Sequence, residues 1–401
     1  MQNNTEIHSM NEEVSLESIK PEKHEISSEP PQDEGYAWVV LFFAAIDALF
    51  AFGSFSSFGV FQTYYLKVMF VNEPAEKIAW IGTCFGMLLA SFSTKIWQLA
   101  LTQGLIFGLG SSLIISVYLT VSTLWFNKHR SLIMGILASS GGLGGLVLIP
   151  LTNKLLVSSS IQWSFRIYGI MFFVCTFIAG IILKPRTEYK PSGKIIDFKL
   201  LKDPIAITLY MAGFFSQTGI FTVIMYFPSS LVDNVGTDRK LATNLLMVFV
   251  STAVIGRTGT GFLAKKFDSV KIMIIGHLLC GILMMSMWYT TKNFTVYLVF
   301  LILFAISSSP YLTLSPIIAA THFSVQKLAQ VNAFTYMFMG LSIFMGLPTL
   351  GLIYEKLGKR SEYTQIITMA AICYFLSAIF LVLLKIAINR KSKRIAEETS
   401  A

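Results

Sequence analysis

The chain has 401 residues, of which 54% are hydrophobic and only 13% are charged, and its mean hydropathy is +0.64. Soluble globular proteins carry about 25% charged residues, so this composition excludes a soluble protein and indicates a polytopic membrane protein. The formal net charge of +9 does not indicate a nucleic-acid partner, because the lysines and arginines lie in short loops between apolar runs.

Residues 1–35 are polar and acidic and contain no apolar run. They are predicted to form a disordered cytoplasmic tail and not a signal peptide. From residue 36 to residue 388, apolar segments of about 20 residues recur, which is the length that crosses a bilayer as a helix. The predicted fold class is an all-α polytopic membrane protein, with spans near 38–60, 99–124, 131–152, 164–183, 204–227, 241–264, 270–290, 295–318, 330–353 and 364–388.

Basic residues in the loops predict the orientation of these helices, since cytoplasmic loops carry an excess of lysine and arginine. One set of alternating loops, together with the C-terminal tail, contains 17 such residues, whereas the intervening loops after residue 120 contain 7. The richer set is therefore predicted to be cytoplasmic. Its longest member, the basic linker 184–203, separates an N-terminal helical bundle (36–183) from a C-terminal six-helix bundle (204–388), and a cytoplasmic tail (389–401) follows.

The region 78–93 does not fit this pattern. The first span ends on the outer side, and the span that begins at Leu99 starts there, so residues 66–99 must cross the membrane an even number of times. An apolar run of about 15 residues crosses once at most. The region is therefore either a re-entrant or interfacial segment, or the N-terminal bundle has an altered topology.

Characteristic stretches lie at several helix ends. "DEGYAWVV" (33–40) opens the first span, and "WFNKHRSLIMGILASSGGLGG" (125–145) joins an aromatic and basic loop to a glycine-rich helix. With "SSFGVFQTYYL" (56–66), "WSFRIYGI" (163–170) and "IGRTGTGFLAKKF" (255–267), they resemble the monocarboxylate-transporter-like family of the major facilitator superfamily, in its fungal branch, which includes riboflavin carriers. The resemblance covers about residues 33–388. It implies a transporter whose two bundles enclose a central site and rock between inward-open and outward-open states.

The same resemblance accounts for the region 78–93. "AWIGT" (79–83) is similar to the start of helix two, and "LLASFSTKIWQLALTQG" (88–104) is similar to the end of helix three running into helix four. About 40–50 residues, comprising two half-helices and a cytoplasmic loop, are then missing between them. The N-terminal bundle is thus predicted to be incomplete, with helices two and three shortened or fused by a deletion or a gene-model error. A genuine re-entrant hairpin is the alternative.

Arg257 and Asp47 lie well inside predicted spans, where a charge is costly and marks a functional site. In the resembled family, an arginine at the place of Arg257 pairs with the substrate carboxylate. The alternative for Arg257 is a side chain that extends to the cytoplasmic interface. Asp47 lies at a depth that suits a proton-coupling carboxylate. Alternatively, Asp47 neutralises a cation or lines a polar groove between helices.

Further substrate-binding candidates lie in the same spans. Ser56 stands where the proton-linked animal carriers of the resembled family have a lysine, and Ala253 stands where they have an aspartate. These departures argue against simple lactate symport and favour a larger, partly aromatic solute. Tyr336 either stacks on a flat ring of such a solute or serves packing. The remaining candidates either hydrogen-bond the solute or bond between helices, and they are Gln217, Asn244 and Asn332.

Neither a metal-binding nor a catalytic constellation occurs in the predicted spans, and the four cysteines are scattered in apolar runs. We therefore predict no enzymatic activity, no metal and no cofactor. The predicted function is secondary active transport of a small organic anion, monocarboxylate-like or riboflavin-like, by proton symport. The alternative is a transport-incompetent, truncated or sensor-like membrane protein. The predicted setting is a monomer among the lipids of the plasma membrane, with a vacuolar or other internal membrane as the alternative.

Overall fold

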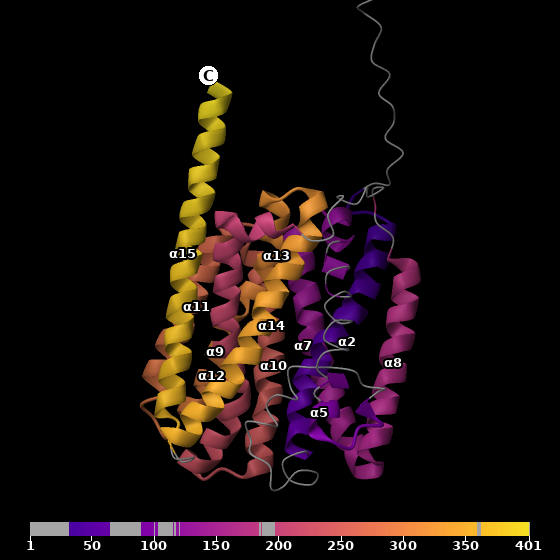
Figure 1. Ribbon diagram of the computed structural model, residues 1–401, viewed down its shortest axis with the longest axis vertical. Helices are drawn as coiled ribbons and strands as arrows, with labels where there is room; N and C mark the ends of the chain where they lie inside the picture. The colour runs from indigo at the N-terminus through magenta and orange to yellow at the C-terminus, as the bar shows by residue number, and fades with distance from the viewer. Residues whose placement is uncertain are drawn as a thin grey trace, which may run out of the picture. The chain divides into compact units, whose positions relative to one another are not determined.

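The computed structural model describes residues 32–64, 90–99, 101–102, 115, 118–119, 121–183, 186, 197–358 and 362–400. Within these residues every regular element is a helix, and eight helices are long and apolar enough to cross a membrane (Figure 1). The compact body of the chain begins at Gln32. The all-α membrane fold predicted from the sequence is confirmed.

Three long helices and one single-turn helix form the N-terminal part of the described chain. Their bounds are Tyr36–Tyr64 for α2, Ile96–Leu99 for α5, Arg130–Ser158 for α7 and Ile161–Ile182 for α8. α2 packs along α7 and also contacts α8. Alanines line the buried face of α2, where Ala37, Ala44 and Ala48 are fully buried. These small side chains let the backbones of neighbouring helices come close, which is how helices associate in lipid.

The C-terminal part contains six candidate membrane spans. Asp203 and Asp268 cap the starts of α9 and α11 by accepting hydrogen bonds from backbone N–H groups of the first turn. Gly236 ends α9 in the left-handed conformation, with φ 73°. Pro310 begins α13 and separates it from α12, since proline has no N–H to donate. The bounds are Phe198–Lys202 for η5, Pro204–Val235 for α9, Arg239–Leu263 for α10, Ser269–Leu283 for α11, Met284–Trp288 for η6, Phe294–Ser308 for α12, Pro310–His322 for α13, Val325–Lys356 for α14 and Thr364–Ser400 for α15.

Several helices are longer than the sequence pattern predicts. α9 continues through Pro228 to Val235, and α15 continues to Ser400. The segment 389–401, predicted as a separate tail, is therefore a helical continuation of the last span as far as Ser400. No proline or glycine occurs between Thr364 and Ala401, so nothing in the sequence stops this helix. The predicted span 99–124 is described only in part, and most of the region 78–93 lies outside the described residues.

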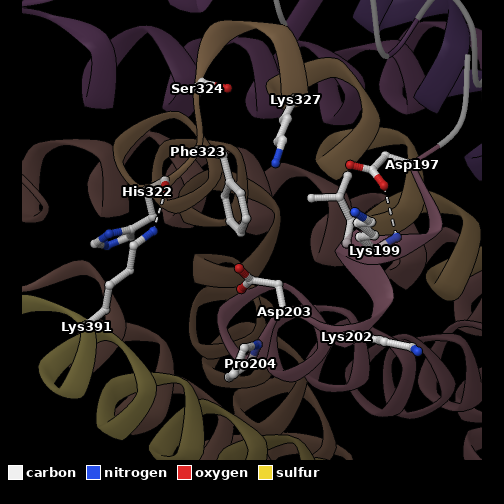
Figure 2. Close-up of a pocket in the computed structure, with 11 residues that line it drawn as sticks. Asp197, Lys199, Lys202, Asp203, Pro204, His322, Phe323, Ser324, Lys327 and Lys391 are labelled. Atoms are coloured by element: carbon white, nitrogen blue, oxygen red, sulfur yellow. Dashed lines mark hydrogen bonds between the residues drawn. The ribbon is translucent and has the colours of Figure 1, made fainter. Parts of the chain in front are cut away.

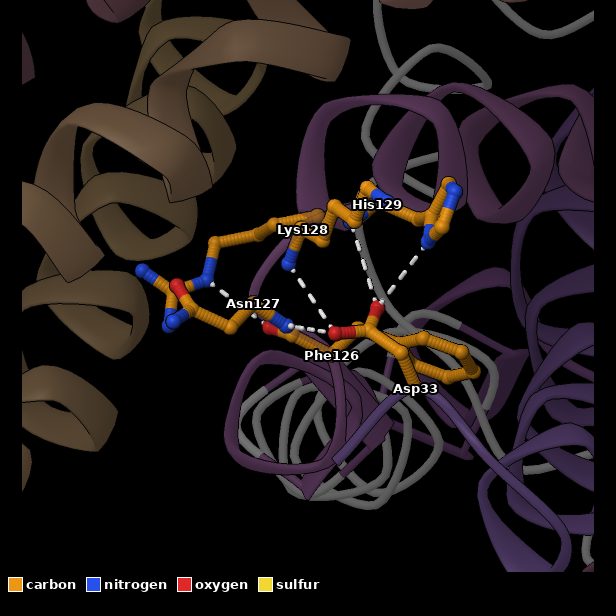
Figure 3. Close-up of polar contacts among 6 residues, drawn as sticks. Asp33, Phe126, Asn127, Lys128 and His129 are labelled. Carbon is orange, nitrogen blue, oxygen red and sulfur yellow. Dashed lines mark hydrogen bonds and ion pairs between the residues drawn. The ribbon is translucent and has the colours of Figure 1, made fainter. Parts of the chain in front are cut away.

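A polar clamp joins the segment before α2 to the loop before α7 (Figure 3). Asp33 Oδ2 accepts hydrogen bonds from the backbone N–H groups of Asn127, at 3.1 Å, and Lys128, at 3.0 Å. Asp33 Oδ1 accepts one from the backbone N–H of His129, at 3.2 Å, and lies 3.3 Å from His129 Nδ1. Burial acts to raise the pKa of Asp33, but these hydrogen bonds outweigh it and hold the pKa below its ordinary value of 3.8. The clamp gives the "DEG" stretch a structural role: its aspartate binds N–H groups that precede a helix and lack helical partners.

Candidate substrate site

The candidate site lies where α7, from the N-terminal part, meets α10, from the C-terminal part. Small residues let these helices approach closely: a Cβ added to Gly261 would lie 2.7 Å from Ser131 O, and one added to Gly135 would lie 3.0 Å from Arg257 O. A Cβ on Gly142 would lie 2.6 Å from Val254 Cγ2. No side chain larger than hydrogen fits at these three places without moving a helix or a neighbouring side chain.

Polar contacts cross the same interface. Ser139 Oγ donates to Val254 O over 3.0 Å and shares a hydrogen bond of 2.8 Å with Thr258 Oγ1. Arg257 Nη1 donates to Ala138 O over 2.7 Å. The two parts of the chain are thus joined here by hydrogen bonds and glycine contacts.

A small cavity lies beside this contact and is bounded by both parts of the chain. Its volume is about 10 Å³, which is about the room that one water molecule needs. Arg257 Nε is buried here and has no hydrogen-bond partner. The guanidinium therefore keeps an unused donor in a cavity that is too small for an organic solute. The lining residues are Tyr118, Leu119, Met134, Ala138, Arg257, Leu312 and Tyr336.

Two of the predicted site residues, Arg257 and Tyr336, line this cavity together. Arg257 does not extend to the cytoplasmic interface, because its Nη1 is bound to Ala138 O within the helix pair. Asn332 precedes Tyr336 by four residues on α14, which places both on one face of the helix. Asn332 is buried, and its Nδ2 has no hydrogen-bond partner. Of these predicted residues, Arg257 and Asn332 each have a buried nitrogen without a hydrogen-bond partner.

Asp47 is buried in α2, with 3% of the residue exposed, and its Oδ1 has no hydrogen-bond partner. It forms no ion pair with Arg257 in the described chain, so it does not neutralise that guanidinium directly. Tyr118 lines the cavity together with Arg257, whereas Asp47 does not line it.

Neither Asn332 nor Asp47 lines the cavity, and the other predicted residues are not among its lining residues. Gln217 is half-buried in α9, and Asn244 is exposed near the outer start of α10. Asn244 precedes Arg257 by thirteen residues, or about 20 Å along the helix axis. Ser56 belongs to α2, but its side chain is not among the side chains that the structure describes.

Tyr118, Met134 and Ala138 contact the cavity but are not among the residues predicted from the sequence. Tyrosine, methionine and alanine are frequent throughout the apolar segments of the chain, so no local signal marks these three. Ala138 contributes a backbone carbonyl, which no side-chain pattern reveals. The other aromatic residues of the C-terminal spans serve packing: Tyr210 stacks on Phe338, and the hydroxyl of Tyr311 donates to Leu209 O.

Known proteins match this chain in fold and in family. The family model described as Major Facilitator Superfamily matches residues 77–210 and 209–400. The solved structure of the proton:xylose symporter XylE superposes with a TM-score of 0.65 at 13% sequence identity, covering 86% of this chain and 95% of that chain. At this identity the likeness concerns the fold alone.

Two fungal proteins are similar over most of their length. The MFS transporter asaE of Aspergillus flavus is 25% identical over 389 residues, which cover 88% of this chain and 87% of the relative. The agnestins efflux protein AgnL12 of Paecilomyces divaricatus is 24% identical over 409 residues, which cover 93% of this chain and 93% of the relative.

Both alignments are longer than the stretch of this chain that they contain. For asaE, 88% of 401 residues is about 353, so about 36 of the 389 aligned positions have no counterpart here. For AgnL12, 93% of 401 residues is about 373, which again leaves about 36 of the 409 positions unmatched. Within the shared region, each relative therefore carries about 36 residues that this chain lacks.

The matches agree with the helical fold. The family model covers most of the chain, and a solved transporter of the same superfamily shares its fold. Members of this family move small molecules across membranes and are not enzymes. The chain belongs to the Major Facilitator Superfamily.

Proposed function

We propose that this chain is a secondary active transporter that carries a small organic anion, monocarboxylate-like or riboflavin-like, together with a proton. The supporting observation is the state of Arg257. Its guanidinium lines the cavity between the two parts, its Nη1 binds a backbone carbonyl, and its Nε is unpartnered. No carboxylate among the described residues pairs with it. A buried charge without a counter-charge is costly, and a substrate carboxylate supplies the missing charge.

The exchange of partners by Arg257 provides the transport step in this proposal. A guanidinium presents its N–H groups as a planar fork that matches a carboxylate with two parallel hydrogen bonds. In the closed arrangement, Nη1 is bound to Ala138 O. When α7 and α10 separate, Nη1 leaves this carbonyl, the cavity widens, and the fork binds the carboxylate of the solute. The rings of Tyr118 and Tyr336 then contact the apolar body of the solute.

Asp47 is the proton carrier in this proposal. A carboxylate in a transporter can take a proton from one side and release it to the other as access alternates. Asp47 is suited to this role because it is buried within α2 and has an unpartnered Oδ1. Asn332, with its unpartnered Nδ2, is the proposed second hydrogen-bond donor to the solute. Gln217, Asn244 and Ser56 are left out of the proposed cavity.

One relative suggests a direction of transport. AgnL12 is named as an efflux protein, and by analogy this chain would export its solute from the cytosol. The plasma membrane is the proposed location because export from the cell requires it, and the vacuolar membrane is the alternative. A fluorescent fusion of the full chain distinguishes these two membranes.

Transport by the purified chain in proteoliposomes tests the proposal. We expect saturable uptake of a labelled organic anion, with lactate and riboflavin as the probes, and stimulation by a proton gradient. Arg257→Ala removes the buried charge that the carboxylate would bind, so uptake is expected to fall by about 100-fold. Arg257→Lys keeps the charge but loses the planar fork, and it is expected to retain a small part of the activity.

Two further variants are measured in the same assay, a control and a test of the proton carrier. Arg166→Lys changes an arginine outside the cavity, whose guanidinium lies 5.0 Å from the ring centre of Trp163, and it should transport normally. Asp47→Asn should preserve exchange of solute across the membrane but abolish the response to the proton gradient. Equal uptake by the wild-type chain and Arg257→Ala would contradict the proposed role of the guanidinium.

A second candidate function follows from the roughly 36 residues that both relatives have in addition. We propose that these residues fall near 78–93, so that the N-terminal bundle (36–183) is incomplete while the linker (184–203) and the C-terminal bundle (204–388) are whole. A chain with this defect would be a transport-incompetent or sensor-like protein. Uptake by this chain is therefore compared with uptake by a variant in which the segment of asaE is restored. Uptake by the restored chain alone selects the second candidate.

A further inference from the structure

A second and much larger pocket lies at the end of the C-terminal part that is predicted to be cytoplasmic (Figure 2). Its volume is about 590 Å³, which is within the usual range for small-molecule sites. Three separate segments line it: the end of the basic linker with the start of α9, the turn between α13 and α14, and α15. The lining residues are Asp197, Lys199, Leu200, Lys202, Asp203, Pro204, His322, Phe323, Ser324, Lys327 and Lys391.

The charges around this pocket are unbalanced. Four lysines and two aspartates line it, which leaves a formal charge of +2 with His322 neutral. Each aspartate already accepts backbone hydrogen bonds: Asp203 Oδ1 binds the N–H groups of Ile205 and Ala206, and Asp197 Oδ1 binds the N–H group of Lys199. None of the four lysines forms an ion pair with another described residue. By contrast, Lys385, which lies outside the pocket on the same helix as Lys391, is bonded to Asp268.

The pocket holds its cationic groups around an aromatic centre. In Figure 2 the ring of Phe323 lies between His322 and Lys391 on one side and Asp197 and Lys199 on the other, while the ammonium of Lys327 points toward the centre. Lys391 Nζ donates to His322 O over 3.2 Å and lies 5.8 Å from the ring centre of Phe323. These two contacts orient Lys391 without neutralising it.

Ser324 also lines the pocket. Ser324 precedes α14, but its side chain makes no capping hydrogen bond, and the residue is exposed. A free hydroxyl at a helix start, next to uncompensated ammonium groups, favours an anionic oxygen as its partner. Lysine ammonium groups bind phosphate as compact point charges.

We propose that this pocket binds a phosphomonoester group at the cytoplasmic surface of the membrane, carried either by an anionic phospholipid headgroup or by a soluble phosphorylated compound. The position favours such a ligand, because anionic lipids concentrate at the cytoplasmic leaflet and attract basic side chains there. Asp197 N also donates to Gln330 Oε1 of α14 over 3.2 Å, so the ligand would bridge the linker, α14 and α15. This site is independent of the solute proposed for Arg257.

Binding to the purified full chain in nanodiscs tests the site. The lipid probe is phosphatidylinositol monophosphate in a phosphatidylcholine background, and the soluble probe is inositol bisphosphate, its headgroup without the acyl chains. Lys327→Gln and Lys391→Gln are each expected to weaken binding about fivefold, and the double variant about 25-fold. Lys266→Gln is the matched control, since it removes an exposed lysine from another loop that is predicted to be cytoplasmic and that does not line the pocket.

Binding of the two probes to these variants distinguishes a lipid ligand from a soluble ligand. If the double variant loses binding of both probes while Lys266→Gln binds normally, the site is supported and its contacts are with the phosphorylated headgroup. Loss of the soluble probe alone supports the site and assigns it to a soluble compound, whereas loss of the lipid probe alone assigns it to a lipid. Equal loss in Lys266→Gln, or no binding of either probe to the wild-type chain, overturns the proposal. Lys199→Gln, an exposed lysine of η5, replaces the double variant if that variant does not fold.

Discussion

The two sides of α10 differ in chemistry. Toward the other C-terminal helices, α10 contributes Ala242, Leu245, Phe249 and Ala253 to a core that also contains Phe304, and the rings of Phe249 and Phe304 stack at 6.2 Å. Toward α7, it presents Arg257, Thr258 and Gly261, which make hydrogen bonds or glycine contacts.

Because of this difference, we expect the apolar core of the C-terminal part to stay packed and the α7–α10 interface to open. The apolar residues of α10 belong to the C-terminal core, whereas those of α7, such as Ile133 and Leu137, belong to a core shared with α2. Interhelical hydrogen bonds in a membrane are worth only about 0.6 kcal/mol each, so a polar interface can be exchanged at small cost. In a transporter that alternates its access, the α7–α10 contact is the one expected to separate.

Among variants that test how α7 is packed, the largest effect is expected from Gly261→Leu. Its side chain would meet the backbone at Ser131 O and Gly135 Cα, so α7 and α10 cannot close, at a cost of about 1–3 kcal/mol. Uptake should fall by at least about tenfold. A second variant, Ala138→Cys, should react faster with a thiol-specific reagent added from the cytosolic side when Gly261→Leu is also present than when it is not. Gly259→Leu is the control two residues away, where an added Cβ meets nothing within 4 Å. Equal uptake by the two variants would contradict the closing role of the interface.

A smaller effect is expected from Asp33→Asn, which tests how α7 is held to its own part of the chain. Weakening the clamp should cost about 1 kcal/mol of stability, as for a lost helix cap. Because the pKa of Asp33 is lowered in the fold, this stabilisation is present above its unfolded value of about 3.9 and is lost as the pH falls through the folded value.

Thermal unfolding in detergent measures the difference. The wild-type chain should be more stable than Asp33→Asn by the same amount between about pH 5 and pH 8, and the difference should shrink as the pH falls below the unfolded pKa of about 3.9. Glu34→Gln is the neighbouring control, since Glu34 is exposed. A difference that grows on acidification would show that the charge of Asp33 is not what holds the loop.

The smallest effect is expected from Ser139→Ala, which removes the hydroxyl bonded to Thr258 and Val254. The loss of about 0.6 kcal/mol should shift the balance between open and closed interface by about two- to threefold. Distances between spin labels on the outer faces of α7 and α10 measure this shift. Ser140→Ala is the control, because Ser140 Oγ donates to Ile136 O within its own helix. An unchanged distance distribution in Ser139→Ala would mean that the hydroxyl of Ser139 does not help to hold the interface closed.

Arg257 and Asp33 show which features can be predicted from the sequence and which cannot. Arg257 is identifiable as a candidate because a guanidinium within an apolar span is rare and costly. Its partner is the carbonyl of Ala138, which lies 119 residues away and carries no side-chain signal. Similarly, the "DEG" stretch is recognisable as a motif, but its contact with residues 127–129 lies more than 90 residues away along the chain. Asn244 has the same polar character as Asn332, yet one is exposed and the other buried.

The sequence by itself determines that this protein crosses the membrane as helices, because lipid offers no partner for backbone N–H and C=O groups and a helix satisfies them within one segment. It also determines which loops are predicted to face the cytosol, through their lysines and arginines. Only the tertiary structure decides which faces of the helices meet, since helix rotation depends on the packing of small residues such as Gly135 and Gly261 against a distant neighbour. That packing places Arg257 between Tyr118 and Tyr336 in one cavity, and the position of a buried charge depends on all the helices that surround it.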